Sequence, residues 1–167
     1  QADGKAIEGE GTVTVTALED AAAADLSSLA ADLTVDAALD STGNVALSAD
    51  LSTLDTLDIT GSGMVTSTAT VNAGLTITVG DGSTLSLAAA AAAEVVGITA
   101  TGTGAVTVTA LHSTLDADLS DIDAPITIVL SDDATLEAGA RIGAVDLTIT
   151  KTGDGPYTCL LYTSPSP

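Results

Sequence analysis

The sequence predicts an all-β protein: a right-handed parallel β-solenoid of about six to seven irregular coils, each burying its apolar face against the next. Three observations lead to this fold class. The chain repeats itself, its short segments alternate hydroxyl or acidic residues with aliphatic ones, and glycine-rich corners separate these segments. Hydrophobic residues make up 46% of the 167 residues, yet Phe and Trp are absent. Such a composition suits a thin interior filled by small aliphatic side chains.

The repeat is clearest between two segments that align without a gap. "GEGTVTVTALEDAAAADLSSLAADLTV" (9–35) and "GTGAVTVTALHSTLDADLSDIDAPITI" (102–128) share a Gly-x-Gly corner and a Val-Thr-Val-Thr-Ala-Leu strand. They also share an Ala-Asp-Leu-Ser element and a closing strand. One such unit cannot bury its aliphatic face alone, whereas a stack of units can. The duplication therefore favours a solenoid.

Two strand types alternate along the chain around the glycine corners. Strands before a corner are expected at 33–35, 57–60, 75–79, 97–101, 126–129 and 147–150. Strands after a corner, each ending in Ala, are expected at 13–17, 45–49, 65–69, 84–88, 106–110 and 134–138. Aliphatic and polar residues alternate along strands of both types, which predicts one face buried in the core and one face exposed to solvent.

The connectors that return the chain to the next coil have a motif of their own. "ADLSSL" (24–29), "ADLSTL" (49–54) and "ADLSDI" (117–122) carry aliphatics at spacings of three and four. These segments are either short helical turns or bent corners that point the aliphatics inward. "AAAAAAEVV" (88–96) occupies the same place and is expected to form a brief helix.

The charge balance excludes several partners. The chain has 23 acidic residues against three Lys and Arg, a net charge of −20. A surface of this sign repels phosphate backbones and anionic lipid, so neither nucleic-acid binding nor membrane insertion is expected. The expected contacts are neighbouring repeats of the same polypeptide and extracellular ligands.

The "GxGxVTVTAL…ADLSxL…LTxT" pattern resembles the repeat regions of large bacterial secreted or surface proteins, the adhesin-like β-strand-repeat proteins. The resemblance implies a structural or adhesive segment, a stalk or display surface, located outside the cell or at its surface. Tandem β-sandwich repeats are the alternative fold. The core Trp or Tyr expected of immunoglobulin-like sandwiches is missing.

The repeat domain is expected to span 5–155 as a fragment without caps, followed by a disordered tail at 156–167. The tail contains the only cysteine, Cys159, and both tyrosines. Residues 159–167, "CLLYTSPSP", resemble a translated sequencing adapter, and we expect them to be an artefact of a metagenomic fragment.

Paired threonines raise a second functional hypothesis, ice binding. Stacked Thr-x-Thr pairs on a flat solenoid face resemble the ice-binding surfaces of antifreeze proteins, and the pattern places Thr76, Thr78, Thr99, Thr101, Thr148 and Thr150 on one face. The simpler interpretation is that Thr is a favoured exposed strand residue that stacks well.

Clustered aspartates give weak candidates for calcium ligands. They are Asp116, Asp118, Asp121 and Asp123. Calcium takes six to eight oxygen ligands, but no EF-hand loop or glycine-rich calcium-binding nonapeptide is present. The favoured interpretation is a solvated acidic face, with no cofactor.

The sequence gives little support to catalysis. His112 is the only histidine, so a histidine-based triad or zinc site has no partners. A carbohydrate-active enzyme remains as an alternative, because paired carboxylates can hydrolyse sugars. The repeats lack the aromatic residues that would stack on sugar rings, and we expect no enzyme activity.

Overall fold

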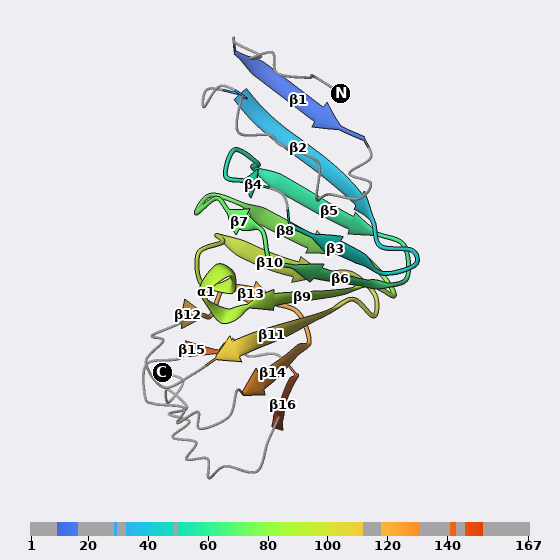
Figure 1. The fold of residues 1–167 in the computed structure, drawn as a ribbon, viewed down its shortest axis with the longest axis vertical. Helices are drawn as coiled ribbons and strands as arrows, with labels where there is room; N and C mark the ends of the chain where they lie inside the picture. The colour runs from blue at the N-terminus through green and yellow to red at the C-terminus, as the bar shows by residue number, and fades with distance from the viewer. Residues whose placement is uncertain are drawn as a thin grey trace.

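The structure, a computed structural model, describes residues 10–16, 29, 33–48, 50–111, 118–130, 141–142 and 146–151. It confirms the predicted fold class: parallel strands stack into about five turns of a β-solenoid with almost no helix (Figure 1). The six to seven coils expected for the repeat domain include segments that lie outside the described residues. Within the described residues, no helix is long and apolar enough to cross a membrane.

Two long sheets form the sides of the rod, and each has six parallel strands. The first sheet contains, in spatial order, β1 (Gly11–Val15), β2 (Leu33–Asp40), β5 (Thr56–Thr60), β8 (Thr76–Val79), β10 (Gly97–Ala100) and β13 (Ile122–Asp123). The second contains β3 (Val45–Leu47), β6 (Met64–Ser67), β9 (Thr84–Ala88), β11 (Ala105–Leu111), β14 (Ile126–Leu130) and β16 (Leu147–Lys151). Tandem β-sandwiches would require antiparallel pairs, so the alternative fold is wrong.

A short third side closes the coils. It contains β4 (Asp50–Leu51) paired with β7 (Thr70–Val71), and β12 (Asp118–Leu119) paired with β15 (Arg141–Ile142). Where the structure describes them, at 50–54 and 118–122, these connectors are therefore bent corners rather than helical turns, whereas 24–28 lies outside the described residues. The side chains of Asp50 and Asp118 each accept a hydrogen bond from the backbone N–H two residues on, at 2.9 and 3.1 Å. These turns redirect the chain while the following leucine stays buried.

The expected helix is present in this third side as α1 (Ala89–Ala92), on the same side of the rod as β4, β7 and β12 (Figure 1). Ala89 and Ala92 face the core and are almost completely buried. Alanine is the strongest helix former, and its small side chain lets the turn pack directly on the β-strands. A helical turn therefore replaces a short strand in this coil.

The predicted division into strand types is wrong for three segments. β1 lies in the first sheet and stacks on β2, whereas β14 and β16 lie in the second sheet, where β14 stacks on β11 and β16 stacks on β14. In each copy of the duplicated unit, both strands therefore stack within one sheet, but the two copies use opposite sheets. The alternating pattern is the same on both sides, so it cannot assign a strand to a sheet. The first-sheet strand of the fifth turn, β13, has only two residues and lacks the Thr pattern. The segment 134–138 lies outside the described residues.

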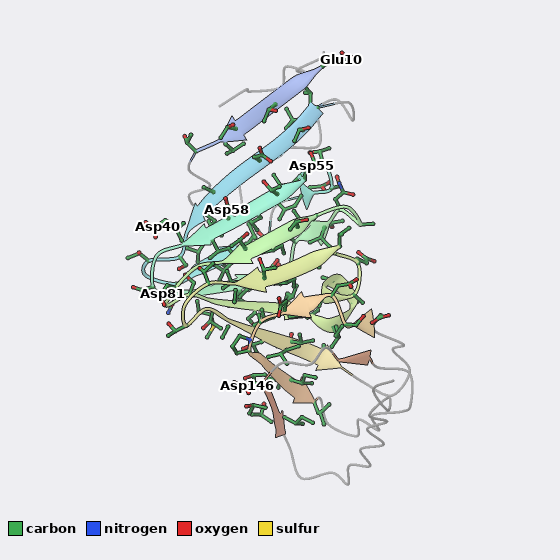
Figure 2. The ribbon with its side chains drawn as sticks, turned by 180° about the vertical axis from the view of Figure 1, so that it is seen from behind. Glu10, Asp40, Asp55, Asp58, Asp81 and Asp146 are labelled. Carbon is green, nitrogen blue, oxygen red and sulfur yellow. The ribbon has the colours of Figure 1, made fainter. Side chains whose placement is uncertain are left out.

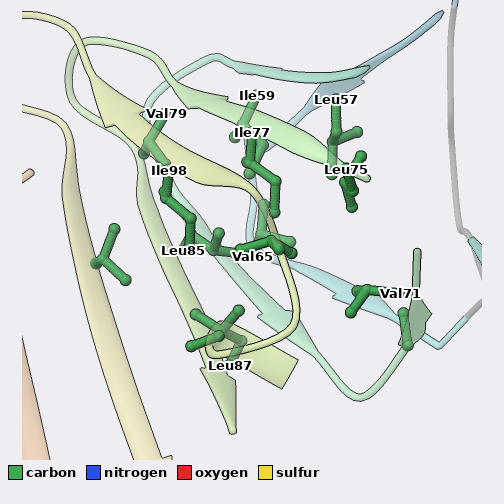
Figure 3. Packing of buried hydrophobic residues seen from close by; sticks show 14 of the residues in the cluster. Leu57, Ile59, Val65, Val71, Leu75, Ile77, Val79, Leu85, Leu87 and Ile98 are labelled. Carbon is green, nitrogen blue, oxygen red and sulfur yellow. The ribbon is translucent and has the colours of Figure 1, made fainter. Parts of the chain in front are cut away.

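The core consists of aliphatic columns that run along the rod, one residue from each coil (Figure 3). Leu57, Ile77 and Ile98 stack in register inside the first sheet, and Val65, Leu85 and Val106 stack inside the second. All six are at most 2% exposed. Branched side chains of similar size fill a narrow interior without aromatic rings, as the composition predicts.

The glycine corners bring successive coils into very close contact. The buried hydroxyls of Ser41 and Ser83 lie 3.1 Å apart, and Ser83 also donates to the carbonyl oxygen of Gly61 at 3.1 Å. The Ser41 hydroxyl accepts a hydrogen bond from the N–H of Gly63. A Cβ added at Gly104 would lie 2.5 Å from the carbonyl oxygen of Val79 in the preceding coil. These corners therefore need residues that are small or internally hydrogen-bonded.

Truncation of one core side chain should destabilise the rod. Ile77→Ala removes a side chain that is 2% exposed and leaves a cavity between two neighbouring coils. The free energy of unfolding, measured by urea titration, should fall by about 2–5 kcal/mol. Thr78→Ala, the next residue on the opposite face, is the control and should cost less than about 1 kcal/mol. Equal losses for the two variants would contradict the assigned faces.

Adding a methyl group at a glycine corner should also destabilise the rod. Gly104→Ala places its Cβ against the backbone oxygens of Val79 and Gly80, which cannot move without shifting a coil. We expect a loss of about 1–3 kcal/mol in the free energy of unfolding. Gly74→Ala is the control, because its Cβ would meet no atom closer than 3.7 Å. A Gly104 variant as stable as the Gly74 variant would show that the coils are not packed this closely.

Candidate functional site

The outward side of the second sheet carries a continuous column of hydroxyl residues. The register aligns Thr66, Ser86, Thr107, Thr127 and Thr148, one from each of five successive strands. Two residues further along the strands, Ala88 lies beside Thr109 and Val129 lies beside Thr150, and a register shift after Val108 interrupts this neighbouring column between the two pairs. We name these nine residues the hydroxyl face. Of these threonines, the sequence pattern singled out Thr148 and Thr150, which it grouped with threonines that lie in the first sheet.

In the central column, Thr66 and Thr148 are exposed, and Ser86, Thr107 and Thr127 are half-buried. The side chains of Thr66, Ser86, Thr107, Thr127 and Thr148 form no hydrogen bond with other described residues. In the neighbouring column, Thr109 and Thr150 donate to the carbonyl oxygens of Leu87 and Ile128, one coil back, each at 3.3 Å. These two bonds fix the side-chain orientation of Thr109 and Thr150, whereas the central column is left to bond with water.

The predicted ice-binding set does not form a single face. Thr76, Thr78 and Thr99 lie on the outward side of the first sheet, in β8 and β10. Thr101 lies in the corner after β10, where it is exposed. Thr148 and Thr150 lie on β16 in the second sheet. The structure therefore brings the first three together and places the last two on the hydroxyl face.

Acidic side chains interrupt the outward side of the first sheet. Asp58 and Asp123 occupy the same column as Thr78 and Thr99. Asp36 lies beside Thr56, whose hydroxyl donates to its carboxylate at 2.6 Å. The first sheet is therefore charged along the rod axis.

The candidate calcium ligands are used in other ways or lie apart. Asp118 accepts hydrogen bonds from the N–H and hydroxyl of Ser120, at 3.1 and 2.6 Å. Asp121 and Asp123 are exposed, and Asp123 sits in the column of the first sheet. Asp116 and His112 lie outside the described residues. Across the described part of the chain, no three His, Cys, Asp or Glu side chains converge as a metal site would require.

Two acids mark the edge where the long sheets meet, Asp40 and Asp81 (Figure 2). Asp81 accepts hydrogen bonds from the N–H and hydroxyl of Thr103 in the next coil, both at 2.8 Å. These bonds, the N–H first, lower the pKa of Asp81. Asp40 accepts from the N–H of Thr42 at 2.9 Å, which likewise lowers its pKa. Hydrogen bonds to the ionised form favour it, so both side chains are held as carboxylates.

The geometry defines the chain as a β-solenoid. Comparison with known proteins does not narrow this class. No family model, curated protein or solved structure matches the chain. The functional interpretation therefore depends on the chain's own columns, corners and charges.

The Asp81 bonds predict a pH dependence. Because the folded-state pKa lies below the ordinary value of 3.8, this carboxylate stabilises the fold above that pH, and the contribution is lost as the pH falls through the folded-state pKa. Asp81→Asn should therefore be less stable than the wild type at pH 6, and the difference should shrink below about pH 3.8. Urea midpoints at several pH values measure this.

Asp58→Asn is the matched control, since its carboxylate forms no hydrogen bond with a described residue. It removes one negative charge from the same rod without breaking a contact between coils. If the two variants showed the same pH profile, net charge rather than the Asp81–Thr103 contact would set the dependence.

Proposed function

We propose that this chain is a structural repeat segment, a stalk or display surface, of a larger bacterial extracellular protein. The observation that carries the proposal is the register of the coils. Equivalent residues stack at intervals of 20 to 24 residues, as in Thr56, Thr76 and Gly97, so each further coil extends the rod while keeping the same two sheets. A protein element built this way supplies length and repeated surface.

Side-chain polarity supports the proposal. Among the described residues, the buried polar or charged side chains are Ser41 and Ser83, and no buried side-chain polar atom lacks a hydrogen-bond partner. The described acids lie on outer sides and corners, where their charge favours solubility. The bacterial extracellular location comes from the resemblance of the repeat pattern, and the expected neighbours are further repeats of the same polypeptide.

The proposal predicts that length can be changed in whole coils. Insertion of three additional copies of residues 76–96 after Val96 preserves every register pair, because Gly97 stacks on Thr76. The longest dimension in small-angle X-ray scattering should grow by about 14 Å, three strand spacings, with unchanged thickness. Fused between a cell-surface anchor and an epitope, the longer segment should hold the epitope further from the cell.

The control is an insertion of residues 76–86 alone, about half a coil. This insertion carries the following strands to the wrong side of the rod and should abolish the cooperative unfolding transition. If the whole-coil insertion also unfolds, or folds without lengthening, the spacer function is wrong.

A further inference from the structure

We propose that the hydroxyl face binds ice, with a plane of ordered water as its ligand. This activity goes beyond the spacer role and does not depend on it. The face is assigned to the outward side of the second sheet, from Thr66 to Thr150, rather than to the threonine set that the sequence pattern suggests.

The first support is the regularity of the grid. Strands that stack in parallel register place equivalent hydroxyls about 4.8 Å apart along the rod, and residues two apart on one strand lie roughly 6.7 Å apart. Thr107 and Thr109 form such a pair, and so do Thr148 and Thr150. A register shift between Val108 and Leu111 separates the two pairs, so the unbroken repeat is the central column from Thr66 to Thr148. A column of hydroxyls and methyls at a fixed spacing can hold waters in a repeating pattern, which a crystal surface requires and a soluble ligand does not.

The second support is the separation of charge from this face. The chain carries a net charge of −20, yet all nine residues of the hydroxyl face are uncharged. The opposite sheet bears Asp36, Asp58 and Asp123 on its outward side. Carboxylates orient their own hydration shells and would disturb a lattice of water. A neutral face on such an acidic rod therefore fits a neutral, extended ligand.

The third support is the state of the central hydroxyls. Thr66, Thr107 and Thr127 form no hydrogen bonds within the described residues, while the hydroxyl of Thr109 is turned onto the backbone. The face thus presents free hydroxyls next to methyls whose orientation is fixed. Water bound to such hydroxyls is positioned before ice arrives, which lowers the entropic cost of binding.

Other occupants fit less well. The chain has no Phe or Trp, and the nine residues that define the hydroxyl face include no aromatic ring on which a sugar could stack. A second copy would bury rows of hydroxyls against each other, and a buried hydroxyl without a partner costs about 1–3 kcal/mol. The face also lacks large apolar side chains, which protein interfaces use as anchors.

The test compares ice activity of the full chain with that of two matched variants. Thr107→Lys places a charged side chain in the central column, and Thr78→Lys makes the same change at a half-buried outward position of the first sheet. We expect the wild type to shape ice crystals and to show thermal hysteresis. Thr107→Lys should lose most of the hysteresis, whereas Thr78→Lys should keep it.

Circular dichroism establishes that each variant is folded, and Thr107→Val with Thr127→Val, which preserves shape, should also lower the hysteresis if the lysine variant fails to fold. A folded wild type without hysteresis or ice shaping would overturn the proposal. So would an equal loss in Thr78→Lys, or sedimentation as a dimer that Thr107→Lys dissociates. Binding to crystalline chitin or cellulose without effect on ice would assign the face to polysaccharide instead. Rod length in scattering is unaffected by these substitutions, so the spacer role is tested separately.

Discussion

Hydrogen bonding between successive coils is the constraint on which the rest of the structure depends. Parallel strands bond evenly along their length, so a coil can stack only if its residues match those of the previous coil in register. Asp55 shows this at a connector: its N–H donates to the carbonyl oxygen of Val35, its carboxylate accepts the Val35 N–H, and its own carbonyl oxygen accepts the Thr76 N–H. One residue thereby joins three coils. Aliphatic columns, outward columns and corner contacts all follow from that alignment.

The sequence predicts the coil but not the side of the rod on which each strand lies. Alternation identifies the core residues Ile77 and Leu85 correctly, since a one-residue slip would expose every aliphatic. The alanine run at 88–96 likewise predicts the helix α1 correctly. Sheet assignment fails because it depends on connector length, and the fifth turn passes through the first sheet in only the two residues of β13. The error moves Thr148 and Thr150 to the wrong face, and the hydroxyl face becomes visible only when the register is known.

The absence of Phe and Trp has consequences for shape as well as for packing. A core of Val, Leu and Ile stacked on neighbours of similar size keeps the two long sheets close and the coils similar in outline. Where the coils approach each other most closely, at the corners, the chain has glycine or serine, as at Gly104 and Ser83, and the core side chains keep a similar size. Such uniformity lines up equivalent residues in columns on the outer sides, which both a spacer and a repeating binding surface require.

The distribution of acids connects the corners with the faces. Asp40 and Asp81 are held as carboxylates at the edge between the sheets by hydrogen bonds from threonines, so charge there supports the fold. The carboxylates on the first sheet bind water on that side of the rod, and the repulsion between them is spread along the rod axis. The neutral threonines of the second sheet supply neither the hydration of a charged side chain nor electrostatic support for the fold. A chain with 23 acidic residues could place one in any outward position, since none of these positions is needed by the core. Acidic residues are nevertheless absent from the nine positions of the hydroxyl face. A purely structural role leaves this absence unexplained, whereas a ligand bound to that face accounts for it.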